Sequence, residues 1–218
     1  MTADNLSARA IRVTATRDAI LIAAERLFAE LGVNAVSNRQ VSEAAGQGNN
    51  AAVGYHFGTK ADLVLAIVRK HQAHTERLCR ERVARVRASA SPQVRDWVEC
   101  LVRPVTEHLG SLGHPTWYAR FVAQLMADPA YRRPLTDESL SSRALRCVIE
   151  GLQVSMGHLP ADLRRERNIM ASLLIVHSCA ERERALAAGE TDPAGGWELT
   201  ATRLVDAITG LYLAPATA

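Results

Sequence analysis

Apolar residues recur with helical spacing along almost the whole chain, so that each turn adds an apolar side chain to the same face. One such stripe runs over residues 20–31 and ends at Gly32, a residue type that commonly follows the last turn of a helix. A second clear stripe covers residues 197–213 near the carboxyl end. No alternating run of β-branched residues is long enough to predict a strand. The pattern therefore predicts an all-α protein with about nine helices.

Polar residues predict where the short helices begin. Ser37 followed by Gln40 has the spacing of a capping box, in which each side chain satisfies a backbone N–H of the other residue. The helix that starts there is expected to be short, because Gly46 falls within three turns of its start. Asn49 or Asn50 can cap the next short helix, since asparagine is among the preferred residues at that position.

The middle of the chain is expected to hold one long helix over residues 60–87, with Thr59 at its amino end. Its second half is rich in arginine between Arg77 and Arg87, and this stretch can face DNA, a partner subunit or water. Beyond it, short segments that contain glycine, proline or serine separate five further helical stretches. These breaks fall at residues 89–92, 110–115, 128–134, 158–160 and 189–196.

The composition of the 218 residues, with 48% hydrophobic and 22% charged residues, suits a globular protein that buries a full core and excludes a disordered or collagen-like chain. The net charge of +3 averages two different parts. Residues 1–90 carry 13 Lys and Arg against 8 Asp and Glu, whereas residues 91–218 carry 13 against 15. A basic amino-terminal part favours a polyanion as the partner of that end, and charge alone leaves ordinary surface variation equally open.

Several classes of protein are not supported by the sequence. The first residues contain no apolar run that would serve as the core of a signal peptide, and no segment reaches the roughly 20 apolar residues of a membrane span. The four cysteines are widely spaced and form no CxxC pair, which predicts reduced core thiols. His71 and His74 stand one turn apart and are only a weak candidate pair of metal ligands. We expect a cytoplasmic protein with no metal ion or cofactor.

Residues 16–60 have the organisation of a helix-turn-helix: a helix, a short helix, a glycine-containing turn and a second short helix. In that geometry the second short helix enters the major groove, and the residues of its first turn reach base edges. Base contacts are therefore expected from residues at its start, because asparagine can pair with adenine and small side chains permit close approach. These residues are Asn49, Asn50, Ala51 and Ala52.

The rest of the expected DNA-binding set consists of polar and basic side chains around this helix. Tyr55 and His56 lie one turn further on, where hydroxyl and imidazole groups reach phosphates. Lys60 and the amino end of the long helix can hold the DNA backbone, and Arg17 is assigned a phosphate contact. The first short helix of the motif contributes the remaining members. They are Ser37, Arg39 and Gln40.

Three ordered motifs lie within these residues. They are Ala24-x-x-Leu27-Phe28 with Gly32, then Val41-x-x-Ala44-Ala45-Gly46, and then Tyr55-His56-Phe57 with Lys60 and Leu63. Together they resemble the amino-terminal DNA-binding domain of the TetR/AcrR family of transcriptional regulators. The chain departs from the family pattern by about one extra residue after the turn glycine and by Gly54 in place of the usual Tyr. These departures leave the register of the base contacts open by one residue.

The resemblance implies an architecture and a function. Residues 1–14 would form a flexible basic arm, residues 15–75 the DNA-binding domain, and residues 76–218 a helical domain for effector binding and dimerisation. The implied function is a ligand-responsive regulator, most simply a repressor, that binds a palindromic operator in double-stranded DNA as a homodimer and is released by a small-molecule effector. A helical protein-interaction module and a helical enzyme are the alternatives. The GxSxG, HExxH, P-loop and dinucleotide fingerprints are missing from the sequence, so we do not expect an enzyme.

Two further sets of residues are assigned in the carboxy-terminal part. Aromatic and polarizable side chains there can line an apolar effector pocket, and ordinary core packing explains each of them singly. The expected pocket residues are Trp97, Cys100, His108, Trp117, Tyr118, Phe121 and Gln124. The resemblance also implies that the last two helices pack against the same pair in a second subunit. Their expected contact residues are Ile169, Leu173, Val176, Val205, Ile208 and Tyr212.

Overall fold

Helices account for most of residues 3–49, 51–190 and 196–216, which are the residues that the computed structural model describes. Within these residues there are ten α-helices and no strand. The helices are α1 (Ala3–Leu31), α2 (Asn38–Ala44), α3 (Ala52–Phe57), α4 (Lys60–Arg87), α5 (Val94–Ser111), α6 (Tyr118–Ala127), α7 (Pro129–Ser141), α8 (Arg143–Ser155), α9 (Ala161–Ala187) and α10 (Gly196–Leu213). The all-α fold that the sequence predicts is confirmed.

Capping boxes start α2 and α4; the sequence predicts the box at Ser37 and a cap at Thr59. The Ser37 hydroxyl accepts a hydrogen bond from the Gln40 N–H at 3.2 Å, and the Gln40 side chain accepts one from the Ser37 N–H at 2.8 Å. Thr59 and Asp62 make the same reciprocal pair at the start of α4, at 3.1 and 3.0 Å. Each box satisfies two of the backbone donors that a helix start otherwise leaves without a partner.

The chain between residues 128 and 155 forms two helices, where the sequence predicts a break followed by one. Asp128 starts α7 by accepting from the Ala130 N–H at 2.9 Å, and Pro129 occupies the first helical position, where its missing N–H costs no hydrogen bond. Ser142 then caps α8 by accepting from the Leu145 N–H at 2.9 Å. The apparent breaker therefore initiates a helix, and the described residues contain ten helices in place of about nine.

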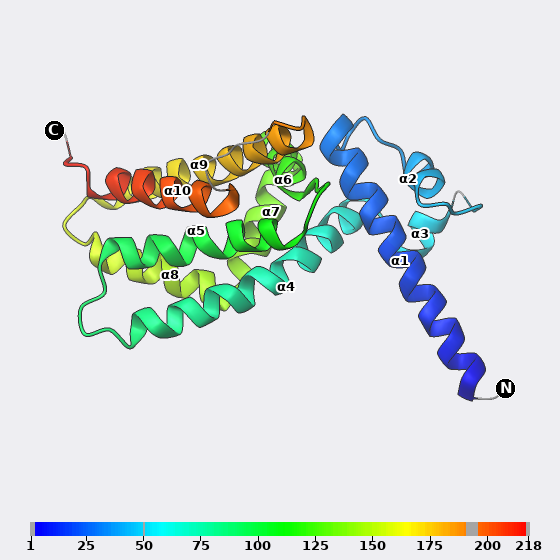
Figure 1. The fold of residues 1–218 in the computed structure, drawn as a ribbon, viewed down its shortest axis with the longest axis horizontal. Coiled ribbons are helices and arrows are strands. Elements are labelled where there is room, and N and C mark those ends of the chain that lie inside the picture. Colours follow the sequence, from blue (N-terminus) through cyan, green and yellow to red (C-terminus); the bar gives the residue numbers. More distant parts are fainter. Residues whose placement is uncertain (1–2, 50, 191–195, 217–218) are drawn as a thin grey trace.

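The amino-terminal arm predicted over residues 1–14 is also corrected. Residues 3–14 continue α1 as one helix of 29 residues, which projects well beyond the other elements (Figure 1). No glycine or proline occurs between Ala3 and Leu31, so the sequence contains nothing that would interrupt the helix there.

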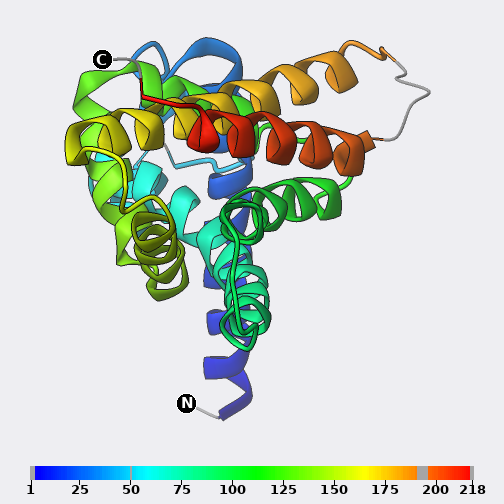
Figure 2. The same cartoon turned by 90° about the vertical axis from the view of Figure 1, so that its left-hand side faces the viewer.

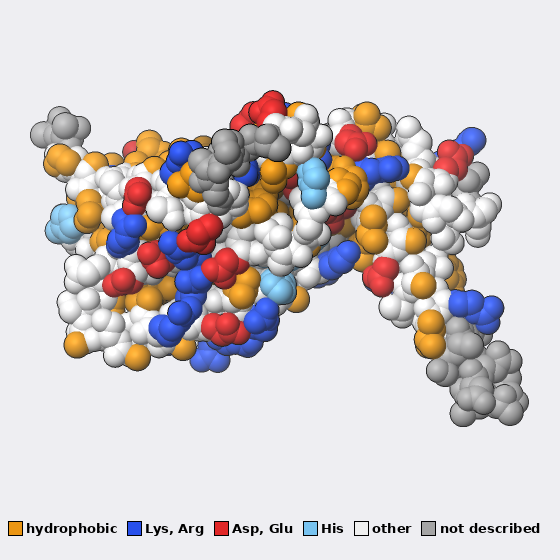
Figure 3. All heavy atoms as spheres, in the orientation of Figure 1, with side chains coloured by type: hydrophobic (Ala, Val, Ile, Leu, Met, Phe, Trp, Pro, Cys, Tyr) orange, Lys and Arg blue, Asp and Glu red, His pale blue; other side chains and the backbone are white. Residues whose placement is uncertain are grey.

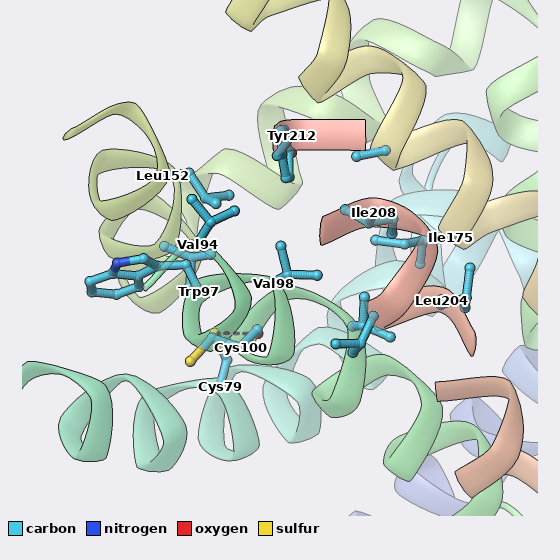
Figure 4. Packing of buried hydrophobic residues seen from close by; sticks show 14 of the residues in the cluster. Cys79, Val94, Trp97, Val98, Cys100, Leu152, Ile175, Leu204, Ile208 and Tyr212 are labelled. Carbon is cyan, nitrogen blue, oxygen red and sulfur yellow. Dashed lines mark hydrogen bonds between the residues drawn. The ribbon is translucent and has the colours of Figure 1, made fainter. Parts of the chain in front are cut away.

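Two separate hydrophobic clusters hold these helices together. Figures 1 and 2 show the arrangement of the helices that contribute to them. The carboxy-terminal cluster joins α4, α5, α8, α9 and α10, and Figure 4 shows side chains such as Trp97, Leu152 and Tyr212 among its members. The amino-terminal cluster joins α1 to α4, but it also includes Phe121 from α6 and Leu135 from α7. The core of the helix-turn-helix is thus completed by helices from the larger part of the chain.

Candidate nucleic-acid interface

The turn between α2 and α3 has the backbone geometry of a helix-turn-helix. Gly46 adopts a φ of +68°, and its N–H donates to the Glu43 carbonyl at 3.0 Å. This left-handed conformation is one that glycine adopts without steric cost. The Asn49 side chain then accepts from the Ala51 N–H at 2.9 Å and so fixes the turn that leads into α3, whose own N-cap residue Ala51 makes no side-chain cap.

One face of α3 packs on the core and the other is open. Ala52 and Val53 are buried, so Ala52 is not available for the base contact that the sequence predicts. Ala51, Gly54 and Tyr55 face outward, and Tyr55 is 78% exposed, with its ring edge-on to the half-buried His56 at 5.0 Å between centroids. We call Asn49, Ala51, Gly54, Tyr55 and His56 the α3 surface. Asn50, the other predicted base contact, lies outside the described residues.

Gly54 serves the α3 surface rather than the packing of α3. A Cβ atom placed there would have no other atom within 4 Å, so no neighbour in the protein requires a glycine. Because Gly54 has no side chain, the backbone of α3 is exposed beside Tyr55. A small residue at this position allows the helix backbone to approach a ligand closely.

Two basic residues of the predicted set are engaged within the protein. The Arg17 guanidinium donates to the His56 carbonyl and lies 4.3 Å from the centroid of the Phe57 ring, so it fastens the carboxyl end of α3 to α1. A cation at that end of a helix satisfies a carbonyl that has no helical partner. The Lys60 ammonium donates to the Val33 carbonyl at 3.1 Å and holds the start of α4 to the segment after α1. Their phosphate contacts stay predictions.

The amino end of α4 also carries its own negative charge. The Asp62 carboxylate accepts from the Thr59 hydroxyl at 2.6 Å, and this hydrogen bond is the main reason why the pKa of Asp62 is lowered. A DNA phosphate that approaches this helix end therefore meets an ionised carboxylate as well as free backbone donors.

On α2, the three predicted residues divide by role. Ser37 and Gln40 satisfy each other in the capping box. Arg39 is exposed and forms an ion pair with Glu43 at 2.7 Å, one turn along the helix. An exposed pair of this kind is worth at most about 1 kcal/mol, so Arg39 can exchange its partner for a phosphate at little cost.

The arginine-rich part of α4 lies at the other end of that helix from the α3 surface (Figure 1). Arg77 pairs with Glu81 at 3.1 Å, and Arg82 pairs with Glu107. Arg85 and Arg87 occupy the last turn, where positive charge suits the helix dipole. Figure 3 shows basic and acidic side chains interspersed over this part of the molecule. The stretch does not extend the α3 surface.

The predicted pocket residues do not line one cavity. Trp97 and Cys100 belong to the carboxy-terminal cluster, whereas Phe121 stacks on Phe28 in the amino-terminal cluster with 6.1 Å between ring centroids. Trp117 donates to Glu30 at 3.2 Å, and Gln124 is exposed. The prediction that these residues share one pocket is therefore corrected: Trp97 and Cys100 belong to one hydrophobic core and Phe121 to the other.

Two of the open grooves in the described part of the chain can be compared with the predicted pocket. One of about 380 Å³ lies between α4 and the α7–α8 corner, with Arg69, Glu76 and Arg143 among its lining residues. The other, of about 340 Å³, includes Trp97 and Cys147 in its lining. Trp97 is the one member of the predicted pocket set that lines either of them.

His108 and Tyr118 instead belong to a buried polar chain between the two cores. The ring nitrogens of His71 lie 2.8 Å from Glu25 Oε2 on one side and 2.8 Å from His108 Nε2 on the other, while Tyr118 stacks on His71 at 3.7 Å. Burial, with the neighbouring imidazoles of His71 and His74 as smaller causes, lowers the pKa of His108 to about 4. The search of the described residues for groups of three or more potential metal ligands finds none.

The predicted dimer contacts of α10 are not at the surface of the chain. Val205, Ile208 and Tyr212 are buried in the carboxy-terminal core, and Figure 4 shows Ile208 and Tyr212 among its members. The α9 contacts differ: Ile169 is 55% exposed and Leu173 is 39% exposed. The third predicted α9 contact, Val176, is half-buried. Two further α9 side chains, Met170 and Leu174, are exposed and extend this surface.

Comparison with known proteins places the amino-terminal helices in a family. The sequence pattern described as bacterial regulatory proteins, tetR family, matches residues 20–67, which run from α1 into α4 and include the α3 surface. Residues 20–67 belong to the tetR family. The family is one of regulatory proteins rather than enzymes, and the match over these residues supports DNA-binding transcriptional regulation.

Three solved structures are similar to this chain. The TetR-family transcriptional regulator PfmR from Thermus thermophilus is 20% identical, with a TM-score of 0.50 over 87% of this chain and 96% of that one. A TetR-family regulator from Streptomyces coelicolor is 20% identical, with a TM-score of 0.42 over 92% of this chain and 96% of that one. The multidrug binding protein EbrR, complexed with imidazole, is 23% identical, with a TM-score of 0.43 over 92% of each chain. No protein of curated function matches the sequence.

Within the described residues, no helix combines the length and apolar composition that crossing a bilayer requires.

The sequence does not reveal Glu25 as a partner of His71, because the two residues are 46 positions apart and nothing in either segment signals the contact.

Proposed function

We propose that this chain is a transcriptional repressor that binds a palindromic operator as a homodimer and is released from it by a small molecule. The observation that carries the proposal is the α3 surface, which is held by the Asn49–Ala51 turn and by Arg17 and whose other side stays open. Such a helix is the element that a helix-turn-helix inserts into the major groove. A protein with this role acts in the cytoplasm, where bacterial DNA lies.

The homodimer is supported by α9. Four exposed apolar side chains within two turns form a patch of a kind that soluble proteins usually cover. They are Ile169, Met170, Leu173 and Leu174. A symmetric pair of such patches places two α3 surfaces on one side of a dimer, which matches a palindrome. Leu173→Asp should make the protein monomeric in sedimentation, whereas Val154→Asp, at an 82% exposed position on α8, should leave the dimer intact.

The operator is tested by selecting bound DNA from a random pool with the full chain. We expect one palindrome to be enriched and its affinity to fall linearly with the logarithm of salt concentration, because phosphate contacts release counterions. Tyr55→Ala should weaken operator binding about tenfold or more, a loss of about 1.4 kcal/mol, with no change in thermal stability because the side chain is exposed. Val154→Ala is the matched exposed control. A pool without enrichment, or wild-type affinity in Tyr55→Ala, refutes the proposal.

The effector is assigned to the helices beyond residue 76. A ligand can release DNA only if it binds the two states of the protein with different affinity. Compounds that raise the melting temperature are therefore to be tested for release of the selected operator. A compound that stabilises the protein and lowers its operator affinity is an effector, and a compound that raises operator affinity makes the protein a ligand-dependent binder instead of a ligand-released repressor.

A further inference from the structure

Glu183 on α9 is a buried carboxylate whose partners all come from the start of another helix. Its side chain is fully buried. One oxygen accepts from the Thr116 hydroxyl at 3.0 Å and the Ala119 N–H at 3.2 Å. The other accepts from the Arg120 N–H at 2.9 Å and the Arg120 Nε at 3.2 Å. Trp117, the residue before α6, makes no side-chain cap, so α9 supplies the cap that α6 lacks.

The donor set fits a carboxylate better than any neutral side chain. Four donors converge on two oxygens, and they include the free backbone N–H groups of a helix start and a guanidinium. Glutamine of the same size would turn its own NH₂ group toward one of these donors. An apolar residue would leave the backbone donors of Ala119 and Arg120 buried without partners.

The first turns of α6 also contact the helices that carry the helix-turn-helix. Trp117 donates to Glu30 of α1, Tyr118 stacks on His71 of α4, and Phe121 stacks on Phe28 of α1. Helix α6 therefore packs on α1 while its amino end is fixed by α9 (Figures 1 and 2). The same α9 carries the exposed apolar residues assigned above to the dimer contact.

We propose that Glu183 is a positioning residue that fixes α1 and the α3 surface relative to the dimer contact of α9, and thereby sets the half-site spacing that the dimer prefers. This inference rests on the proposed function as a dimer on a palindromic operator. Loss of the carboxylate frees the amino end of α6 from α9, so the two α3 surfaces are no longer held at one separation. Operators with other spacings then compete with the preferred one.

The test is a selection from palindromes in which the spacer between fixed half-sites varies one base pair at a time. The variant is Glu183→Gln, and the control is Val148→Ala, which opens the carboxy-terminal core at a buried position away from α6. We expect Glu183→Gln to shift or broaden the preferred spacing by at least one base pair and to weaken binding to the wild-type optimum about tenfold. Val148→Ala should lower the melting temperature yet keep the wild-type spacing.

Thr116→Val supplies a second variant that removes one hydroxyl donor with little change of shape, and it should broaden the spacing preference by a smaller amount. If Glu183→Gln does not fold, Thr116→Val carries the test. Wild-type spacing preference in a folded, dimeric variant overturns the role of Glu183. If the wild-type protein itself enriches no palindrome, the proposed function fails instead, so the two failures are distinguishable.

Discussion

Gly151 of α8 is predicted to be a position where a single methyl group destabilises the protein. A Cβ atom built on Gly151 would overlap Cε2 of Trp97 and lie 2.5 Å from Cδ2 and Cζ2 of the same ring. Separations below 3 Å force one group to move, and the indole is packed within the carboxy-terminal cluster on its other side. Gly151 therefore lets α8 and α5 approach each other across the Trp97 ring.

The magnitude follows from two opposing effects of Gly151→Ala. Alanine in a helix interior is favoured over glycine by about 1 kcal/mol. Overpacking a core costs about 1–3 kcal/mol, and three ring carbons of Trp97 within 2.5 Å of the added Cβ place this site at the upper end. We expect a net loss of about 1–2 kcal/mol in the free energy of unfolding, which lowers the melting temperature by roughly 2–8 °C for a chain of this size.

The assay is thermal and urea unfolding at one protein concentration, because the proposed dimerisation would make the melting temperature concentration-dependent. Gly54→Ala is the matched control, since its Cβ would meet nothing within 4 Å and the same substitution should be neutral or stabilising there. Trp97→Phe removes the ring carbons that overlap, so Gly151→Ala should cost less in that background, with a coupling of about 1 kcal/mol or more. Wild-type stability of Gly151→Ala, or equal costs in both backgrounds, refutes the reasoning.

Four other outcomes are expected. Stability should fall as pH drops from about 7 to about 4, because unfolded histidine takes up a proton near pH 6.5 whereas His108 stays neutral until about pH 4; His108→Gln should flatten this dependence in urea midpoints. Gly54→Ala should bind the selected operator more weakly in gel shifts without losing stability, and equal affinity would show that DNA does not approach this point of α3. Arg17→Ala should lower the free energy of unfolding by about 1 kcal/mol through loss of its bond to α3, which a wild-type urea midpoint would contradict. A fragment of residues 1–75 should show little cooperative unfolding in circular dichroism, because Phe121 and Leu135 complete its core.

Local signals in the sequence were sufficient for much of the fold. The capping boxes at Ser37 and Thr59 occur where the side-chain spacing indicates, because a cap depends on residues three positions apart. The glycine turn before α3 is set by local backbone preference in the same way. Pro129 shows the limit of such reasoning: proline both ends and begins helices, and only the Asp128 cap beside it decides between the two.

The sequence does not predict which part of the protein, or which partner, packs against an apolar stripe. The stripe with Val205, Ile208 and Tyr212 has helical period whether it faces its own core or a second subunit, and the structure gives it to its own core. The same holds for the predicted pocket residues Trp97 and Phe121, which belong to different clusters. Periodicity reports that a helix has an apolar face; it carries no information about what lies against that face.

The contacts between the two cores could not be predicted from the sequence. They are also the contacts on which the proposed regulation depends. They join residues 46 to 87 positions apart, such as Glu25 with His71 and Trp117 with Glu30. They are polar or aromatic and directional, whereas the cores on either side are apolar and tolerate small shifts of packing. A change at α9 can reach the α3 surface through fixed hydrogen bonds at Glu183 and then through ring stacking on α1. Because directional bonds hold one geometry or break, this junction is the part of the chain suited to two discrete positions of the helix-turn-helix.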